Sequence, residues 1–349
     1  MDRVERTPAM LILSGGLGLG AYQLGAYEAL AERLDIAAVA GSSIGAFNGA
    51  IIAGNPPERR LERLLAFWAA NVTELVPGML PPLMPVGGPF RHLQNWANTL
   101  AARLGGARAL FHPRPGLGLG DEVPSFYDSA RASAALTGLV DFDRLNAGGT
   151  RFCVAATDIE TGALVTFDTA AGDRIGIDHL LASGGLLPSF APVRIDGRLL
   201  GDGGFAANAP LEPFLASDRQ GALPPLAVLI DLFAPDGPVP RRIETAAERA
   251  TDLKWATQTL LRLQGLVRER ALEARWRDDP GTTLLHLSYR PRSEEAGSEK
   301  PYDFSAASLR DRAAAGHADA QAALARLDAI EHPGTPGLHV HPIRRPETA

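Results

Sequence analysis

Two short apolar runs near the start of the chain each lead through a glycine-containing turn into a helix-like pattern. The first run, residues 10–14, ends at glycines, and apolar side chains then recur at helical spacing over residues 21–34. The second run, residues 36–40, is followed by a tight turn at 41–45 and a small-residue helix at 46–53. Successive strand–turn–helix steps are typical of a parallel sheet covered by helices, so we expect an α/β fold.

The composition limits the classes of protein to which the chain can belong. Of its 349 residues, 46% are apolar and 21% are charged, which is typical of globular proteins and not of disordered or fibrous ones. The 34 Lys and Arg residues are outnumbered by 40 Asp and Glu residues, and a net charge of −6 gives no electrostatic reason to bind nucleic acid. The single cysteine, Cys153, excludes an internal disulfide and a Cys-based zinc cluster.

The sequence contains no pattern typical of a membrane-spanning helix. The longest weakly polar stretch, residues 75–90, is interrupted by five prolines and three glycines. The apolar run at 10–13 is too short for the apolar part of a signal peptide. We therefore expect a cytoplasmic protein, with peripheral contact to a membrane left open.

A long Pro- and Gly-rich insert interrupts the regular patterns at residues 75–126. Such an insert is either a surface excursion or a lid or lipid-facing surface. We expect a catalytic core at 8–215, a C-terminal part at 216–330 that completes the sheet and adds helices, and a loose tail at 331–349. Further strands and helices are predicted at residues 57–71, 93–104, 152–157, 164–168, 177–182, 193–200, 226–231, 243–275, 283–288 and 305–327.

The turn at residues 14–20 allows three interpretations. Gly16, Gly18 and Ala21 fit the loose dinucleotide-binding pattern, but the second strand does not end in the acidic residue that this pattern requires. A phosphate-binding loop is excluded because Ala21-Tyr22 stands where Lys and Ser or Thr are needed. A turn that serves only packing, and a loop whose amides stabilise an oxyanion, remain open alongside the dinucleotide site.

The second turn reads Gly-x-Ser-x-Gly, with Ser43 between Gly41 and Gly45. This motif places a serine hydroxyl on a sharp strand-to-helix bend, at the positive end of the following helix. Because it follows the second strand, the motif argues against a standard α/β-hydrolase, in which the bend comes later. We expect Ser43 to be a nucleophile.

A third turn, Asp202-Gly203-Gly204, follows a predicted strand pair at 193–200. Taken alone, this sequence is typical of a plain tight turn. The eight histidines, however, show no local signature of a catalytic base. An early serine bend without a convincing histidine makes Asp202 a candidate base.

These three turns, in this order, resemble those of the patatin-like phospholipase family. In that family a glycine-rich loop follows the first strand, Gly-x-Ser-x-Gly follows the second, and a later Asp-Gly-Gly or Asp-Gly-Ala supplies the base. The chain departs from the family at Leu17, where a third glycine is usual, and at Leu19, where Arg or Lys is frequent. Similarity to a bacterial subgroup extends over residues 20–23, 51–57, 125–128, 140–143, 157–162, 182–184, 208–211 and 302–305.

The resemblance implies a three-layer α/β/α patatin-like fold with a mostly parallel central sheet and a helical C-terminal extension. It also implies that Ser43 attacks an ester to form an acyl-enzyme and that Asp202 accepts the serine proton. The implied oxyanion hole comprises Gly15, Gly16, Leu17 and Gly18. The implied supporting glycines are Gly20, Gly41, Gly45, Gly203 and Gly204.

The implied function is that of a serine lipid acyl hydrolase, similar to phospholipase A or a lysophospholipase, acting on a phospholipid or another fatty-acyl ester. No metal or other cofactor is implied. Two alternatives stay open: a non-catalytic or weakly active lipid-binding or interaction module on the same scaffold, and an acyltransferase. In the long helix at 243–275, Leu253, Leu260, Leu263 and Val267 lie on or near one face, which predicts core packing or a homodimer contact.

Overall fold

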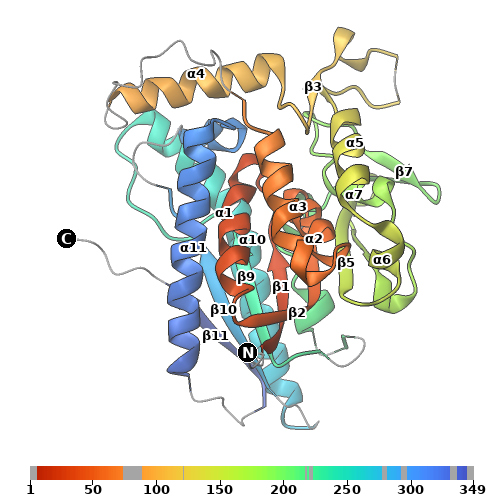
Figure 1. Ribbon diagram of the computed structural model, residues 1–349, viewed down its shortest axis with the longest axis vertical. Coiled ribbons are helices and arrows are strands. Elements are labelled where there is room, and N and C mark those ends of the chain that lie inside the picture. The colour runs from red at the N-terminus through yellow and green to blue at the C-terminus, as the bar shows by residue number, and fades with distance from the viewer. Residues whose placement is uncertain are drawn as a thin grey trace.

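A central β-sheet runs through the molecule and contains strands from both halves of the chain (Figure 1). The computed structural model describes residues 6–73, 89–120, 122–216, 218–219, 223–276, 281–291, 297–330 and 336–343. Within these residues one sheet has the order β11-β10-β9-β1-β2-β5-β8-β7, with β6 paired to β5. Its strands are β1 (Thr7–Leu13), β2 (Leu34–Ser42), β5 (Arg151–Asp158), β6 (Leu164–Asp168), β7 (Val193–Ile195), β8 (Arg198–Asp202), β9 (Leu226–Asp231), β10 (Thr282–Ser288) and β11 (Leu338–Ile343).

The sheet is mostly parallel. All pairs from β11 to β5 are parallel, whereas β6 and β8 pair with β5 in the antiparallel sense, and β7 pairs with β8 in the same sense. The helices and short 3₁₀ segments near the sheet are η1 (Leu17–Gly20), α1 (Ala21–Leu30), α2 (Ile44–Ala53), α3 (Pro57–Ala70), α4 (Pro89–Gly105), α5 (Ala130–Leu139), α6 (Phe142–Asn146), α7 (Ile177–Ser183), α8 (Gly204–Ala207), α9 (Glu212–Leu215), α10 (Ile243–Glu273), η4 (Gly297–Tyr302) and α11 (Ala306–Asp328).

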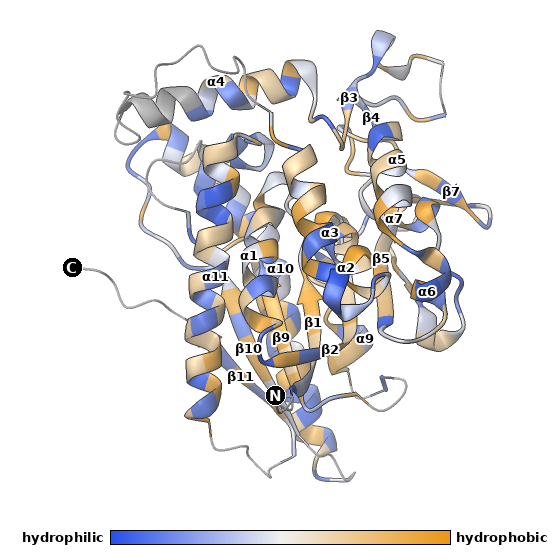
Figure 2. Ribbon diagram, in the orientation of Figure 1, coloured by the Kyte–Doolittle hydropathy of each residue, from blue (hydrophilic) through white to orange (hydrophobic). Residues whose placement is uncertain are grey.

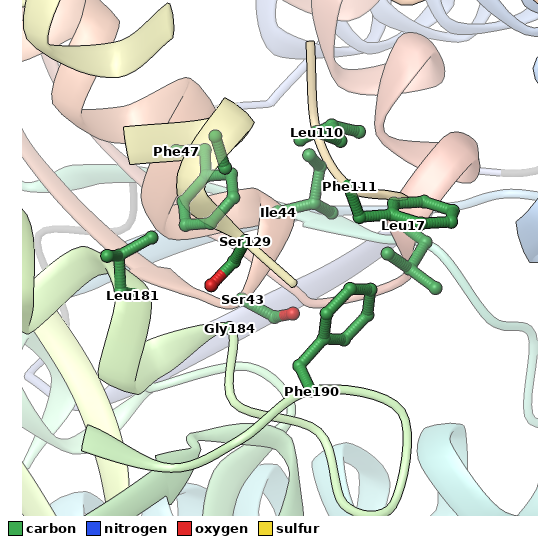
Figure 3. Close-up of a pocket in the computed structure, with 11 residues that line it drawn as sticks. Leu17, Ser43, Ile44, Phe47, Leu110, Phe111, Ser129, Leu181, Gly184 and Phe190 are labelled. Atoms are coloured by element: carbon green, nitrogen blue, oxygen red, sulfur yellow. The ribbon is translucent and has the colours of Figure 1, made fainter. Parts of the chain in front are cut away.

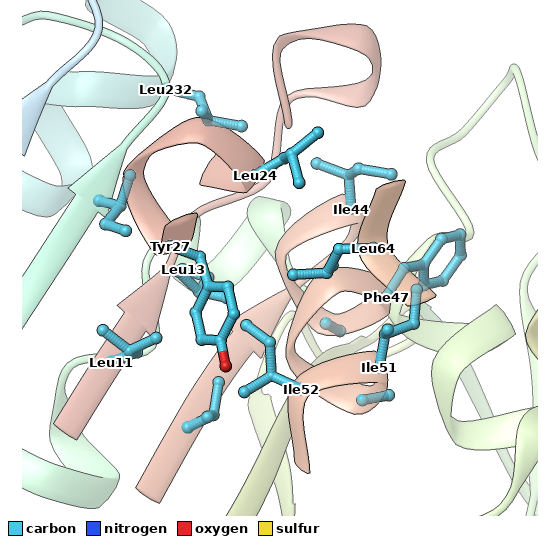
Figure 4. Packing of buried hydrophobic residues seen from close by; sticks show 14 of the residues in the cluster. Leu11, Leu13, Leu24, Tyr27, Ile44, Phe47, Ile51, Ile52, Leu64 and Leu232 are labelled. Atoms are coloured by element: carbon cyan, nitrogen blue, oxygen red, sulfur yellow. The ribbon is translucent and has the colours of Figure 1, made fainter. Parts of the chain in front are cut away.

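Side chains alternate between the two faces of β1 and so create two apolar layers. Leu11 and Leu13 pack with residues of α1, α2, α3 and α11, a cluster that Figure 4 shows from close by. Met10 and Ile12 point the other way and pack with residues of α9 and α10. Figure 2 shows mainly apolar strands between helices that carry polar residues. The predicted three-layer α/β/α fold is confirmed.

The C-terminal half of the chain is continuous with this sheet. β9 lies directly between β1 and β10, and β11 extends the sheet beyond β10. The prediction of a loose tail is therefore wrong for Leu338–Ile343, which pairs along its length with β10. The histidines and proline of this edge strand hide its alternation in the sequence, yet Leu338 and Val340 still pack against the apolar layer beneath.

The Pro- and Gly-rich insert contributes one long helix and a small antiparallel strand pair. α4 begins at Pro89 and lies at the top of Figure 1, at the opposite end from the N-terminus. β3 (His112–Pro113) pairs with β4 (Tyr127–Asp128). The predicted lipid-facing stretch at 75–90 falls almost entirely outside the described residues. Each helix among the described residues is too short or too polar to cross a bilayer.

Helices α1 and α11 cross at a contact that requires glycine on both sides. A Cβ atom on Gly25 would lie 1.8 Å from the Ala313 carbonyl oxygen, and one on Gly316 would lie 1.9 Å from the Tyr22 carbonyl oxygen. Tyr22 also donates a hydrogen bond of 2.7 Å from its hydroxyl to Asp319. Because α1 follows the first glycine-rich turn directly, this close packing fixes the end of that turn.

We predict that Gly25→Ala and Gly316→Ala each lower the free energy of unfolding by about 2 kcal/mol or more, because the helices must separate. Alanine improves helix propensity by only about 1 kcal/mol. The control is Gly265→Ala in α10, where nothing lies within 4 Å of an added Cβ, and which should be neutral or slightly stabilising. Denaturant unfolding measures all three, and equal effects at the three positions would contradict the prediction.

Candidate active site

Ser43 occupies a strained bend between β2 and α2. Its φ of 53° and ψ of −125° lie where an L-residue is rarely found. The bend closes tightly because Gly41 and Gly45 lack side chains. A Cβ on Gly41 would lie 2.4 Å from the Gly45 carbonyl oxygen, and one on Gly45 would lie 2.3 Å from the Leu13 carbonyl oxygen. The predicted strand–turn–helix context of the motif is therefore confirmed.

The sheet brings Asp202 to the same edge as Ser43, although 158 residues separate them in sequence. β5 lies between β2 and β8, with Ser42 opposite Ala155 and Ala156 opposite Asp202. Ser43 directly follows β2 and Asp202 ends β8, so the two residues lie at the ends of strands that flank β5. Ser43 and Asp202 line the same cavity, and the Ser43 side chain favours the ionised form of the Asp202 carboxyl.

The Asp202 carboxyl is buried, with 3% of its surface exposed. Burial raises its pKa from the ordinary 3.8 to about 6, and hydrogen bonds from the Ser43 side chain and the Gly204 amide partly oppose this rise. The Gly204 N–H donates to Asp202 Oδ1 at 2.7 Å. A carboxylate with a raised pKa is a better proton acceptor than an ordinary one, and at pH 7 it is still mostly ionised.

Ser183, the last residue of α7, connects the two turns. The Ser43 N–H donates to Ser183 Oγ at 2.9 Å, and the Gly203 N–H donates to the Ser183 carbonyl oxygen at 3.2 Å. Ser183 is fully buried. One residue thus holds the backbone on both sides of the Ser43–Asp202 contact.

The first glycine-rich turn is held against this pair by Asn208. The Gly15 N–H donates to the Asn208 carbonyl oxygen at 3.0 Å, and the Asn208 amide donates to the Gly15 carbonyl oxygen at 3.4 Å. The Gly15 amide is thus engaged within the protein, so its role is to hold the loop. The remaining predicted oxyanion donors, at Gly16, Leu17 and Gly18, stay predictions.

A chain of buried polar side chains supports the same turn from the helix side. Gln23 donates to the Ser14 carbonyl oxygen at 2.8 Å, Asn48 donates to Gln23 at 2.9 Å, and the Trp68 indole donates to Asn48 at 3.1 Å. These residues come from α1, α2 and α3, so the packing of three helices sets the position of the loop.

The two leucines that depart from the family pattern have different positions. Leu17 adopts a φ of 49° and reaches the left-handed region that a glycine would occupy without cost. Its side chain lines the cavities beside Ser43. Leu19 is fully buried in the core, so an apolar side chain fills the position where the family often has a cation.

Two cavities meet at Ser43 and Leu17. The first measures about 380 Å³ with the solvent at its mouth included, and Figure 3 shows Ser43 and Ser129 among apolar side chains that include Phe47, Phe111 and Phe190. The second holds about 580 Å³ and is lined by Gly15, Gly16, Leu17, Ser43, Leu186, Asp202, Asn208, Phe233, Thr251, Trp255, Pro301 and Tyr302. Because the glycine loop lines the second cavity together with Ser43 and Asp202, its position favours the oxyanion interpretation over the dinucleotide and packing interpretations.

A second serine–histidine–aspartate grouping lies at the ends of β9 and β10 and has a different geometry. His286 Nε2 is 3.1 Å from Ser288 Oγ and 3.9 Å from Asp231 Oδ2. A proton relay needs the two partners on opposite ring nitrogens. Here both partners face the same nitrogen, so the group does not form such a relay.

The described residues show neither a cluster of metal ligands nor an accessible cysteine thiol. Among them, His, Cys, Asp and Glu do not gather in a group of three or more that could hold a metal. Cys153 is fully buried in β5, and burial raises the pKa of its thiol. A thiol in that state is a poor nucleophile.

The sequence patterns did not assign roles to several residues that shape the site. Ser183 and Asn208 lie within short stretches, 182–184 and 208–211, that matched the family without revealing a function. Trp255 and Tyr302 come from the C-terminal half, where the apolar spacing of α10 suggested only packing or dimerisation. In α10, Leu263 is buried against the sheet, whereas Leu253 is 43% exposed. The homodimer stays a prediction.

Comparison with solved structures found similar chains of low identity, including the following three. VipD from Legionella pneumophila is 14% identical, with a TM-score of 0.37 over 88% of this chain and 67% of VipD. Two structures of the ExoU–SpcU complex of Pseudomonas aeruginosa contain a chain that is 18% or 21% identical, with TM-scores of 0.28 and 0.27. These alignments cover 76% and 79% of this chain and 53% and 54% of the matched chains, so the chain spans about half their length.

A search of curated proteins found no match. Models of protein families, in contrast, match segments in both halves of the chain. A model described as patatin-like phospholipase matches residues 11–215, which is more than half of the chain. A second, described as patatin phospholipase, matches residues 248–335. The resemblance seen in the three turns is therefore confirmed, and the chain belongs to the patatin-like phospholipase family.

Proposed function

We propose that the protein is a serine lipid acyl hydrolase that cleaves carboxylic esters through Ser43 and Asp202. The observation that carries this proposal is that Ser43, on its strained bend, and the buried Asp202 carboxyl line one cavity together, while Ser43 also lines a second, apolar cavity. Membership of a family of lipid hydrolases supports the same conclusion.

In the proposed reaction, Asp202 takes the proton of the Ser43 hydroxyl while the oxygen attacks the ester carbonyl. The negative charge on the tetrahedral intermediate is stabilised by loop amides at Gly16, Leu17 and Gly18. The intermediate collapses as the protonated Asp202 gives its proton to the departing alcohol oxygen, which leaves an acyl group on Ser43. Water, deprotonated by Asp202, then releases the carboxylic acid and restores the free serine.

In this proposal the first cavity receives the acyl chain of the ester, because its lining is mainly apolar. Its walls include Ile44, Phe47, Phe111, Leu181 and Phe190, and Ser43 lies at its edge. Apolar walls favour a fatty-acyl chain because its transfer from water is worth roughly 0.8 kcal/mol per methylene group. The acyl chain would thereby bring the ester carbonyl to the nucleophile.

The first test of the proposal is the loss of activity in Ser43→Ala and Asp202→Asn. We expect each variant to lower ester hydrolysis by about 10³-fold or more, since the two residues act as one unit. A fluorophosphonate should label the wild type and fail to label Ser43→Ala. The control is Ser133→Ala on α5, a serine that lies outside both cavity linings. Equal labelling of the wild type and Ser43→Ala would refute the proposal.

The raised pKa of Asp202 predicts a dependence of activity on pH. The base must be ionised to accept the serine proton, so activity is lost as pH falls through about 6 and is regained as pH rises. The logarithm of kcat/KM should rise with a slope of about 1 below pH 6 and then level off. Circular dichroism at each pH checks that the protein stays folded. A rate that is constant from pH 5 to 8 would contradict this role.

Ser183→Ala tests the support of the dyad. The substitution leaves the buried Ser43 N–H without its hydrogen-bond acceptor, which typically costs about 1–3 kcal/mol. We expect kcat to fall by roughly 10-fold while KM changes little. The control is Ser308→Ala, which removes a buried hydroxyl that is bonded to Asp303. A purely structural role would lower thermal stability in both variants and slow fluorophosphonate labelling in neither.

A further inference from the structure

The second cavity at Ser43 is walled largely by the C-terminal half of the chain. Phe233 follows β9, Thr251 and Trp255 lie on α10, and Pro301 and Tyr302 end η4. These residues face the glycine loop, Ser43 and Asp202 across about 580 Å³ of space. The cavity thus joins the reacting groups to a wall that the three turn motifs do not include.

The position of Asp202 decides what this cavity holds, if the proposed function is correct. Asp202 lines the second cavity and does not line the first, whereas Ser43 lines both. In ester cleavage, the acid formed from the base must reach the oxygen of the departing alcohol. With the acyl chain in the first cavity, the alcohol oxygen therefore lies on the side of the second.

We propose that the second cavity binds the alcohol portion of the ester and that its lining selects an uncharged alcohol, such as the glycerol of an acylglycerol, over one that carries a phosphate. The walls are mainly aromatic and aliphatic, with Phe233 and Trp255 packed at a centroid separation of 6.3 Å. Among the residues that line the cavity, Asp202 is the charged one. A phosphate placed there would lose water to mainly apolar walls without gaining a cation from the lining, and it would face a carboxylate of the same sign.

Cations close to this wall contact other groups, and the Lys254 ammonium lies over the Trp255 ring, 4.5 Å from its centroid. Lys300, next to Pro301, is buried and places its Nζ 2.9 Å from Asp252 and 3.2 Å from Glu248 on α10. Arg103 stacks over the Tyr302 ring, 4.0 Å from its centroid, and forms an ion pair with Glu299. The charges of Lys300 and Arg103 are each balanced by a carboxylate, so recruiting either residue for a phosphate would break an existing ion pair.

The test compares two esters that differ only in the phosphate: 1-oleoylglycerol and 1-oleoyl-glycerol 3-phosphate, presented in the same neutral detergent micelles. We expect kcat/KM for the uncharged ester to exceed that for the phosphate by about 10-fold or more in the wild type. Thr251→Lys would put an ammonium group into the lining and should narrow this ratio at least several-fold. Thr251→Glu should widen it.

The matched control is Thr257→Lys, which adds the same charge on α10 outside the lining and should keep the wild-type ratio. A wild type that hydrolyses the phosphate ester as fast as the uncharged one would overturn the inference. So would ratios in both Thr251 variants that equal the ratio in Thr257→Lys. Failure of the proposed function has a different signature, namely no hydrolysis of either ester and no fluorophosphonate labelling at Ser43.

Discussion

The contact between a buried carboxylate and a hydroxyl on a strained bend is the constraint that organises the site. Removing Asp202 from water costs free energy, and that cost is limited by the Ser43 hydroxyl and the Gly204 amide, both of which favour its ionised form. The contact forms only because β5 holds β2 and β8 in register on either side of it. The parallel centre and the antiparallel end of the sheet must therefore meet correctly before any chemistry is possible.

Much of this arrangement can be predicted from the sequence, because the glycine turns have a direct physical meaning. A serine between Gly41 and Gly45, after one strand and before one helix, requires a tight bend, and the bend is present. The contribution of Ser183 could not be predicted, since it depends on a contact across 140 residues. The same limit applies to β11, whose polar residues hide an edge strand that only its pairing with β10 reveals.

The C-terminal half of the chain shares its sheet and one of its cavities with the three turns. β9 is inserted beside β1, and the residue pair Trp255 and Tyr302 closes one side of the space next to Ser43. The apolar periodicity of α10 correctly predicted that Leu263 packs in the core. It could not show that Trp255 lines a cavity, because a helix of 31 residues passes several different environments along its length. Both family models, one for each half, match a single structural unit.

The burial of Asp202 also makes the stability of the folded chain depend on pH, in the direction opposite to that of the proposed activity. The folded protein keeps the Asp202 proton up to a pH of about 6, whereas an unfolded chain releases it near the ordinary value of 3.8. Between these values the native state binds more protons, so rising pH lowers the free energy of unfolding, by up to about 3 kcal/mol from this one group. The contribution of Asp202 to stability is therefore greatest in acid, where the proposed base is protonated, and smallest at neutral pH, where the proposed base is ionised.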